Sequence, residues 1–180
     1  GVTRVFRLGG AHAIAALAYG TATVPKVDKI VGPGSAYVAT AKAQVSAECP
    51  IDFYAGPTEI VILATTSKSD WIAADLIAQA EHDPDARSIV VTPDRNLAAK
   101  IVERVKQRLP ADGPARSSIQ RYGTVVVTKS LEESIELVNQ IAPEHLVCDR
   151  DNIAHRIIRA GTIFIGPYSA QAAGDYATGS

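Results

Sequence analysis

The sequence predicts an α/β protein with doubly wound, mostly parallel sheets. Short runs rich in Val and Ile alternate with longer amphipathic segments, which is the order of strands and helices in βαβ units. Most strand-like runs are apolar throughout, as strands covered by helices on both faces are. Two Gly-rich turns, "LGGAHAIA" and "VGPGSAYV", lie where nucleotide-binding turns occur. Neither has the standard G-x-G-x-x-G sequence, so a Rossmann-like fold is expected and plain turns are the alternative.

The first part of the chain supplies strands and helices for two βα units. In chain order we expect a strand, a helix, a strand, a helix and a strand over residues 3–8, 11–20, 29–32, 35–48 and 51–54. Gly20 ends the first helix, because glycine readily adopts the backbone conformation that closes a helix. Ser35 begins the second, because its hydroxyl is a good N-cap group.

The remainder of the chain continues the same alternation. Strands are expected over residues 59–65, 88–92, 123–128, 144–148 and 161–166, and helices over 69–82, 94–109, 130–142 and 152–160. Ser69 or Asp70 is expected to cap the first of these helices. Ser130 and Glu133 have the spacing of a capping box. Residues 110–118, "PADGPARSS", have the composition of a loop.

The break between sub-domains is predicted near Ala55–Glu59, in the turn "AGPTE". Two βα units precede this turn, and the strands and helices after it suffice for a second sheet. We therefore expect two incomplete or adjoining sub-domains, residues 1–57 and 58–180. The chain has no methionine and stops within a Gly-rich stretch, so we also expect an excised segment of a longer protein.

Composition and charge argue against several classes of protein. The formal net charge of −1 comes without a basic stripe that could displace phosphate counterions, so we expect no nucleic-acid partner. No apolar run approaches the roughly 20 residues that span a bilayer, and no signal peptide opens the sequence, so we expect no membrane association. Cys49 and Cys148 lack a CxxC partner, which is typical of reduced thiols in a cytoplasmic protein.

Polar groups at the end of the helix over 69–82 form the first candidate site. Gln79 and His82 are three residues apart, so they lie on one helix face and can address a single point. A carboxamide oxygen and an imidazole nitrogen are both acceptable ligands for zinc or manganese. The alternative is a polar helix end in which His82 complements the helix dipole.

A second candidate pair is Glu144 and His145 in "APEHLV", where Pro143 ends the preceding helix. A carboxylate beside an imidazole can activate water and accept protons near neutral pH. Neighbours in an extended chain point in opposite directions, so both face one substrate only if the backbone bends there. A surface pair at the start of a strand is the alternative. Asp175 in "AGDYATG" could add an oxygen ligand from a loop, although such a residue is usually a turn former.

Together these motifs are similar to those of a known family. In order and spacing, the middle portion of histidinol dehydrogenases resembles "GGAHAIAALAYGT", "KIVGPG", "IDFYAGPTEI", "AADLIAQAEHDPDAR", "IAPEHL" and "GTIFIG" through "GDYATG". The resemblance covers nearly the whole chain, and the combination of "AQAEHDP" with "APEHL" is its most specific part. It implies a zinc-containing, NAD-dependent enzyme that oxidises L-histidinol through the aldehyde to L-histidine, in the last steps of histidine biosynthesis.

The resemblance also implies the roles of individual residues. The zinc ligands would be Gln79, His82 and Asp175, and the substrate would be contacted by these three together with Thr58 and His145. Glu144 would activate the water of the second oxidation, and His145 would take the alcohol proton. Residues 1–57 would belong to the NAD-binding domain, and residues 58–180 would carry the zinc and catalytic residues. The full-length protein would be a homodimer whose fourth zinc ligand, a histidine, comes from the partner subunit.

Three positions differ from the usual family pattern. His12 and Ser35 stand where the family has a glutamine and an asparagine that contact NAD, and Thr58 stands where a serine contacts substrate. Serine lacks the paired donor and acceptor of an amide, so nucleotide binding could change. These differences leave two alternatives: a related zinc and NAD dehydrogenase of another small polar alcohol, or an inert scaffold fragment without its completing C-terminal segment. The isolated 180 residues are expected to be inactive.

Overall fold

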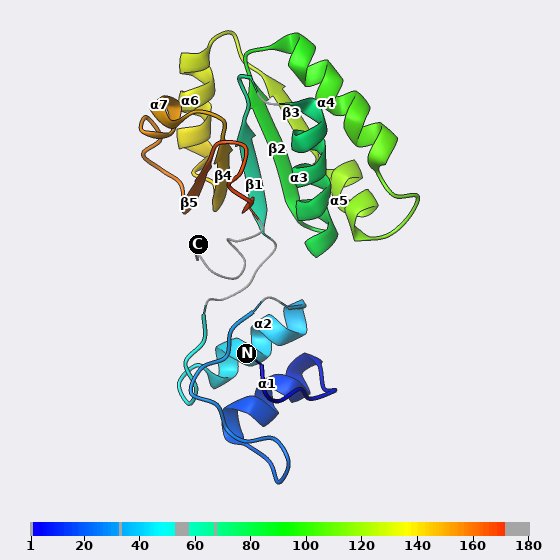
Figure 1. Ribbon diagram of the computed structural model, residues 1–180, viewed down its shortest axis with the longest axis vertical. Helices are drawn as coiled ribbons and strands as arrows, with labels where there is room; N and C mark the ends of the chain where they lie inside the picture. The colour runs from blue at the N-terminus through cyan, green and yellow to red at the C-terminus, as the bar shows by residue number, and fades with distance from the viewer. Residues whose placement is uncertain (1, 33, 53–57, 67, 172–180) are drawn as a thin grey trace. The chain divides into compact units, whose positions relative to one another are not determined.

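The computed structural model describes residues 2–32, 34–52, 58–66 and 68–171 (Figure 1). The chain divides into two compact units, one within residues 1–56 and the other within residues 57–178. These are referred to as unit 1 and unit 2, and each is described by itself.

Unit 1 contains two helices that pack against each other. They are α1, Gly10–Tyr19, and α2, Ala36–Val45. Their small core consists of Ile14, Ala18, Ile30, Val45 and Cys49. The backbone N–H of Gly20 donates to the carbonyl of Ala16, so glycine closes α1 as the sequence predicts. Ser35 is the N-cap residue of α2, but its side chain makes no capping hydrogen bond.

The strands predicted in unit 1 are wrong in extent. Residues 2–9 form no strand, and Val2 and Val5 are 86% and 84% exposed. Where strands were expected over 29–32 and 51–54, the described residues contain one parallel bridge, between Ile30 and Ile51, and residues 53–54 lie outside the described part. Apolar, β-branched composition favours an extended chain. A strand forms, however, only where another strand accepts its hydrogen bonds, and no described strand pairs with residues 2–9.

Unit 2 is built on a five-stranded, fully parallel sheet in the order β3-β2-β1-β4-β5. The strands are β1, Glu59–Leu63; β2, Arg87–Thr92; β3, Thr124–Val127; β4, His145–Cys148; and β5, Thr162–Ile165. The order of the chain reverses between β1 and β4, which is the topological switch point of a doubly wound sheet. The predicted α/β class with a parallel sheet is confirmed.

Helices cover both faces of this sheet (Figure 1). One face is covered by α3, Ser69–His82, α4, Arg95–Arg108, and α5, Pro114–Tyr122, around a core that includes Ile60 and Ile62. The other face is covered by α6, Leu131–Ile141, and α7, Asp151–Ala154, around a core that includes Val61 and Leu63. Neighbouring residues of β1 therefore point to opposite faces, as the period of two in a strand requires.

Three local predictions in unit 2 are wrong. Residues 110–118 were expected to form a loop, but α5 begins at Pro114, which occupies the first turn, where a missing N–H costs nothing. The N-cap of α3 is Lys68, one residue before the expected Ser69 or Asp70, and no side chain caps the helix. The helix expected over 152–160 is confined to the four residues of α7.

The capping box at the start of α6 is confirmed in part. The hydroxyl of Ser130 accepts a hydrogen bond from the N–H of Glu133 at 3.2 Å. The carboxylate of Glu133 accepts from the N–H of Lys129 at 2.6 Å instead of that of Ser130. The side chains of Ser130 and Glu133 thus accept hydrogen bonds from two backbone N–H groups at the start of α6.

Neither cysteine forms a disulfide: Cys49 and Cys148 are free and buried. Burial raises the pKa of the Cys148 thiol, the carboxylates of Asp149 and Asp151 raise it further, and a hydrogen bond to the backbone of Arg150 lowers it. A protonated, buried thiol is a weak nucleophile, so Cys148 belongs to the core rather than to a reactive site. Within the described part of the chain, no helix has both the length and the apolar character needed to cross a membrane.

Asp94 caps α4, and its carboxylate accepts hydrogen bonds from the N–H groups of Asn96 and Leu97 at 2.8 and 3.1 Å. Asp94→Ala removes the oxygen that accepts both hydrogen bonds, so we expect the free energy of unfolding to fall by about 1 kcal/mol, as measured by urea denaturation. Asp94→Asn keeps an acceptor oxygen and should lose much less. Asp112→Ala is the control, because Asp112 is exposed and outside any helix; an equal loss there would contradict the capping role.

Candidate active site

Two of the predicted metal ligands lie at the C-terminal end of α3. The helix ends at His82, as the sequence predicts, and Asp83 then adopts an extended backbone. Gln79 is fully buried, whereas His82 is exposed. Their spacing places both on one face of the last helical turn. The end of α3 therefore presents a carboxamide and an imidazole together.

Thr58 orients the carboxamide of Gln79. The amide Nε2 of Gln79 donates a hydrogen bond to the hydroxyl Oγ1 of Thr58, immediately before β1. The other polar atom, Oε1, is buried and has no hydrogen-bond partner among the described residues. A buried carbonyl oxygen without a hydrogen-bond partner destabilises the folded protein by about 1–3 kcal/mol. Such an atom is a candidate ligand for a metal ion or a substrate. The family resemblance implied a substrate contact for Thr58, and no local pattern pointed to this hydrogen bond.

His145 is the first residue of β4 and is only 1% exposed. Its ring meets that of Phe164 edge to face, with the centroids 5.8 Å apart. Neither Nδ1 nor Nε2 has a hydrogen-bond partner in the described part of the chain. Apolar packing thus fixes the plane of the imidazole and leaves both nitrogens available for proton transfer.

The backbone bends at Glu144, as a shared role for Glu144 and His145 requires. Ala142 closes α6 in the left-handed conformation, with φ of 52°, and Pro143 prevents further helix. The start of β5 then holds the bend, because the N–H of Thr162 donates to the carbonyl of Glu144 at 2.9 Å. A Cβ on Gly161 would lie 2.6 Å from that carbonyl oxygen, so this close approach requires glycine.

Strand register brings Gln79 and His145 to the same face and edge of the sheet. His145 is in register with Ile60, which faces α3, and Thr58 lies two residues before Ile60 on the same face. A strand rises about 3.3 Å per residue and neighbouring strands lie about 4.8 Å apart, so the Cα atoms of Thr58 and His145 are roughly 8 Å apart. The end of α3 and the start of β4 therefore border one site at the amino edge of the sheet.

Asp175, the third predicted metal ligand, lies outside the described residues. Within the described ranges, no group of three His, Cys, Asp or Glu side chains is placed to hold a metal ion. The atoms that are described fit zinc chemically, because an unpaired carboxamide oxygen and an imidazole are acceptable zinc ligands.

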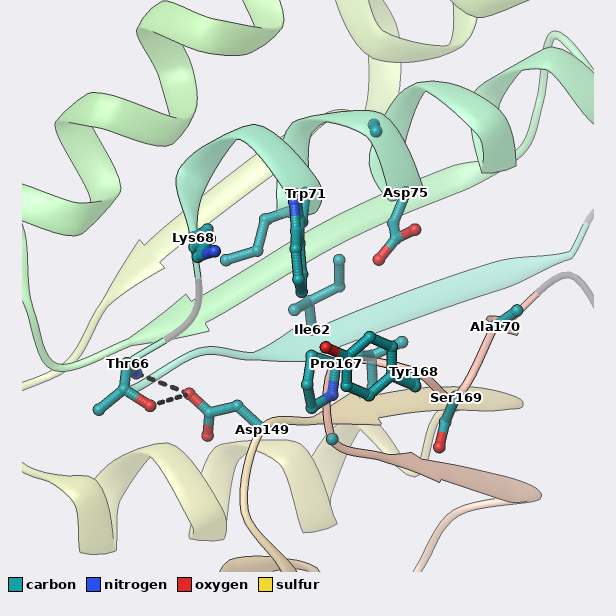
Figure 2. Close-up of a pocket in the computed structure, with 14 residues that line it drawn as sticks. Ile62, Thr66, Lys68, Trp71, Asp75, Asp149, Pro167, Tyr168, Ser169 and Ala170 are labelled. Carbon is teal, nitrogen blue, oxygen red and sulfur yellow. Dashed lines mark hydrogen bonds between the residues drawn. The ribbon is translucent and has the colours of Figure 1, made fainter.

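The opposite, carboxyl edge of the sheet is arranged differently (Figure 2). At the switch point, the carboxylate of Asp149 accepts hydrogen bonds from the N–H groups of Thr65 and Thr66 at 2.8 and 2.6 Å. The first two backbone donors beyond β1 therefore already bind a carboxylate. No sequence pattern predicted this contact, which joins residues 84 positions apart.

A hollow of about 590 Å³ lies beside Asp149, and Figure 2 shows Trp71 and Asp75 of α3 on one side of it and Tyr168 on the other. Burial raises the pKa of the Asp75 carboxyl. None of the predicted site residues lines this hollow. This hollow and the candidate catalytic groups thus lie at opposite edges of the sheet of unit 2.

The two predicted cofactor positions lie at helix starts in unit 1. His12 is exposed in the first turn of α1, and Ser35 is the exposed N-cap of α2. Neither helix start has a side-chain cap or an acidic residue in its first turn. A Cβ on Gly9, Gly10 or Gly32 would meet no atom within 4 Å, so these turns are open to an approaching ligand.

Comparison with known proteins decides the family. The family model described as histidinol dehydrogenase matches residues 1–180, the whole chain. The chain belongs to the histidinol dehydrogenase family. Histidinol dehydrogenases from Nitrobacter winogradskyi and Geobacter sulfurreducens are 49% and 51% identical to it over 100% and 99% of the chain. The alignments cover 44% and 43% of those relatives, so the chain spans less than half of their length.

A solved structure agrees with this assignment. The histidinol dehydrogenase from Elizabethkingia anophelis aligns with 96% of the chain and 41% of its own chain, with a TM-score of 0.76 and 37% identity. The resemblance noted in the sequence is therefore confirmed at the level of family and fold.

The unsatisfied oxygen of Gln79 gives a test that needs no substrate. Gln79→Leu replaces a buried polar group that lacks half its partners, so we expect the free energy of unfolding of the metal-free protein to rise by about 1 kcal/mol in urea denaturation. Gln120→Leu, on the exposed surface of α5, is the control and should change stability little. A loss of stability specific to Gln79→Leu would mean that Oε1 is satisfied within the protein.

Proposed function

We propose that this chain is the middle portion of a zinc-containing, NAD-dependent dehydrogenase that oxidises L-histidinol in two steps, through the aldehyde, to L-histidine. Membership of the histidinol dehydrogenase family supports an oxidoreductase of histidine biosynthesis. The observation that carries the finer proposal is the site at the amino edge of unit 2. There a buried carboxamide oxygen and a buried imidazole, both without partners among the described residues, lie on the same face of the sheet and at the same end of its strands.

The proposed zinc site uses Gln79 through Oε1, His82 through its imidazole, and Asp175 through its carboxylate. The hydrogen bond from Gln79 to Thr58 supports this set, because it turns the amide nitrogen toward Thr58 and leaves the oxygen for the ion. A fourth ligand, a histidine of the partner subunit in a homodimer, would complete four-coordinate geometry. When bound, zinc would hold and orient the substrate and supply modest Lewis-acid assistance.

The proposed proton-transfer roles are those that the family resemblance implies, and the bend at Glu144 supports them. In the first oxidation, His145 accepts the hydroxyl proton of the alcohol while a hydride leaves the adjacent carbon for NAD, giving the aldehyde. In the second oxidation, Glu144 accepts a proton from the water that attacks the aldehyde, and a second hydride goes to another NAD. The packing of His145 against Phe164 supports a fixed acceptor position, because the ring has no hydrogen bond to break before it takes a proton.

The nucleotide is assigned to unit 1 rather than to unit 2. In unit 2, the carboxylate of Asp149 lies directly beyond β1 and accepts from the N–H groups of Thr65 and Thr66, and its negative charge opposes a phosphate at the switch point. In unit 1, the uncapped starts of α1 and α2 and the open glycines offer N–H groups to a pyrophosphate. His12 and Ser35 are the proposed contacts to NAD. The protein is further proposed to be cytoplasmic, with free thiols.

The deciding experiment is NADH formation by the full-length protein with L-histidinol and zinc. We expect two NADH per histidinol consumed, with L-histidine as product. Activity on another small polar alcohol, with none on histidinol, would overturn the substrate assignment and favour a related dehydrogenase. The 180 residues alone should show no turnover, because the proposed metal site needs a ligand from outside them.

Separate substitutions of Glu144 and His145 test their roles. His145→Asn removes the proton acceptor of the first step, so we expect the rate of histidinol oxidation to fall by about 10²-fold or more. Glu144→Gln should slow aldehyde oxidation more than alcohol oxidation, because only the second step consumes water. Single-turnover assays started from histidinol and from the aldehyde distinguish the two steps. Equal effects of both substitutions on both steps would contradict the division of roles.

Metal analysis tests His82 independently of turnover. His82→Asn should reduce bound zinc per subunit to a small fraction of the unsubstituted value after dialysis, because the shorter asparagine carboxamide replaces the imidazole, the stronger zinc ligand. His155→Asn is the matched control: His155 is exposed and pairs with Asp151 at 3.3 Å, away from the end of α3. Full zinc occupancy in His82→Asn would exclude His82 from the ligand set.

A further inference from the structure

Unit 1 contains an ion pair between a buried lysine and a partly buried aspartate that the proposed chemistry does not use. Lys42, on α2, is 0% exposed, and its ammonium pairs with the carboxylate of Asp52. Among the described residues, Lys42 is the only Lys, Arg, Asp or Glu in the buried class. Burying a charge pair is costly, and apolar residues of similar size are often no less stable. The pair therefore calls for an explanation other than stability.

Both members of the pair bind the backbone of one residue, Gly32. The N–H of Gly32 donates to Oδ2 of Asp52 at 2.6 Å, and the ammonium of Lys42 donates to the carbonyl of Gly32 at 3.0 Å. Gly32 has φ of 112°, which side-chain-bearing residues rarely adopt. The pair thus holds the peptide groups on either side of Gly32 in a fixed orientation.

Gly32 lies between Ile30, which pairs with Ile51 in a parallel bridge, and the start of α2. The bridge brings Asp52 beside Gly32, and the N–H of Asp52 donates to the carbonyl of Ile30 at 3.2 Å. Next to it, Gly34 is pressed against α2, because a Cβ there would lie 2.6 Å from Cγ1 of Val38. Gly32 and Gly34, which precede the uncapped start of α2, are therefore each held by contacts of their own.

We propose that Lys42 and Asp52 are positioning residues for a dinucleotide phosphate: through Gly32 they set the direction in which the N–H groups at the start of α2 face the ligand. This inference rests on the proposed function, because it takes the nucleotide to bind unit 1. The pair acts through geometry rather than through net charge, since its two charges cancel. It needs no contact with the nucleotide itself.

The test uses the double substitution Lys42→Met with Asp52→Leu in the full-length protein, which removes the pair without leaving a lone buried charge. Titration calorimetry with NAD and with ADP-ribose measures binding without turnover. We expect both dissociation constants to rise about tenfold or more, the loss expected for one hydrogen bond to a charged phosphate. The dissociation constant of histidinol and the zinc content should stay at the unsubstituted values.

The matched control is an exposed ion pair of unit 2, between Arg121 and Asp85, with 3.3 Å between Nη1 and Oδ1. Arg121→Met with Asp85→Leu removes the same charges and should leave ADP-ribose binding unchanged. Unaltered ADP-ribose binding in the Lys42 and Asp52 double variant would overturn the inference. Parallel losses of nucleotide, histidinol and zinc would also overturn it, because they indicate a merely structural role.

Two further readouts keep the test decisive. If circular dichroism shows that the double variant does not fold, Asp52→Asn replaces it. That substitution keeps the size of the side chain and removes its charge, and should weaken ADP-ribose binding about threefold or more; unchanged binding overturns the inference. If the unsubstituted protein binds neither NAD nor ADP-ribose, the cofactor assignment of the proposed function is wrong. That result is distinct from a loss of binding caused by the substitutions.

Discussion

The register of β1 against β4 determines where the candidate chemistry of unit 2 can lie. The pairing of Ile60 with His145 directs the imidazole to the face covered by α3, the helix that carries Gln79. A slip of one residue would turn the imidazole toward α6. The bend at Glu144 and the close approach of Gly161 hold that register at the point where β4 begins. One parallel strand pair thus unites groups more than 60 residues apart in the sequence.

The site retains polar atoms that the surrounding packing leaves unsatisfied. Oε1 of Gln79 and both ring nitrogens of His145 are buried without partners in the described part of the chain. Oε1 of Gln171 is a further buried atom without a partner among the described residues, whereas the buried hydroxyls of Ser88 and Ser118 donate to the carbonyls of Leu76 and Ala86. Buried polar atoms without partners lower the stability of the folded protein. They are typical of functional sites, where binding or catalysis needs groups that stability alone would not favour.

The sequence predicts local features better than long-range contacts. Helical periodicity and Gly20 place α1, and the Ser130 spacing places α6, because both signals lie within a few residues. The contacts of Asp149 with Thr65 and of Lys42 with Gly32 depend on tertiary pairing that no local pattern encodes. The spacing of Gln79 and His82 indicated a shared direction, whereas their relation to β4 required the strand register.

The strand-like run at the start of the chain has a consequence for handling the protein. Val2 and Val5 are almost fully exposed, and Phe6 and Leu8 are partly so. Extended, apolar and β-branched segments whose backbone groups lack a neighbouring strand act as templates for pairing with other molecules. Concentrated solutions of these 180 residues should therefore aggregate through this run, and a lysine in place of Val5 is the simplest substitution that would keep them dispersed.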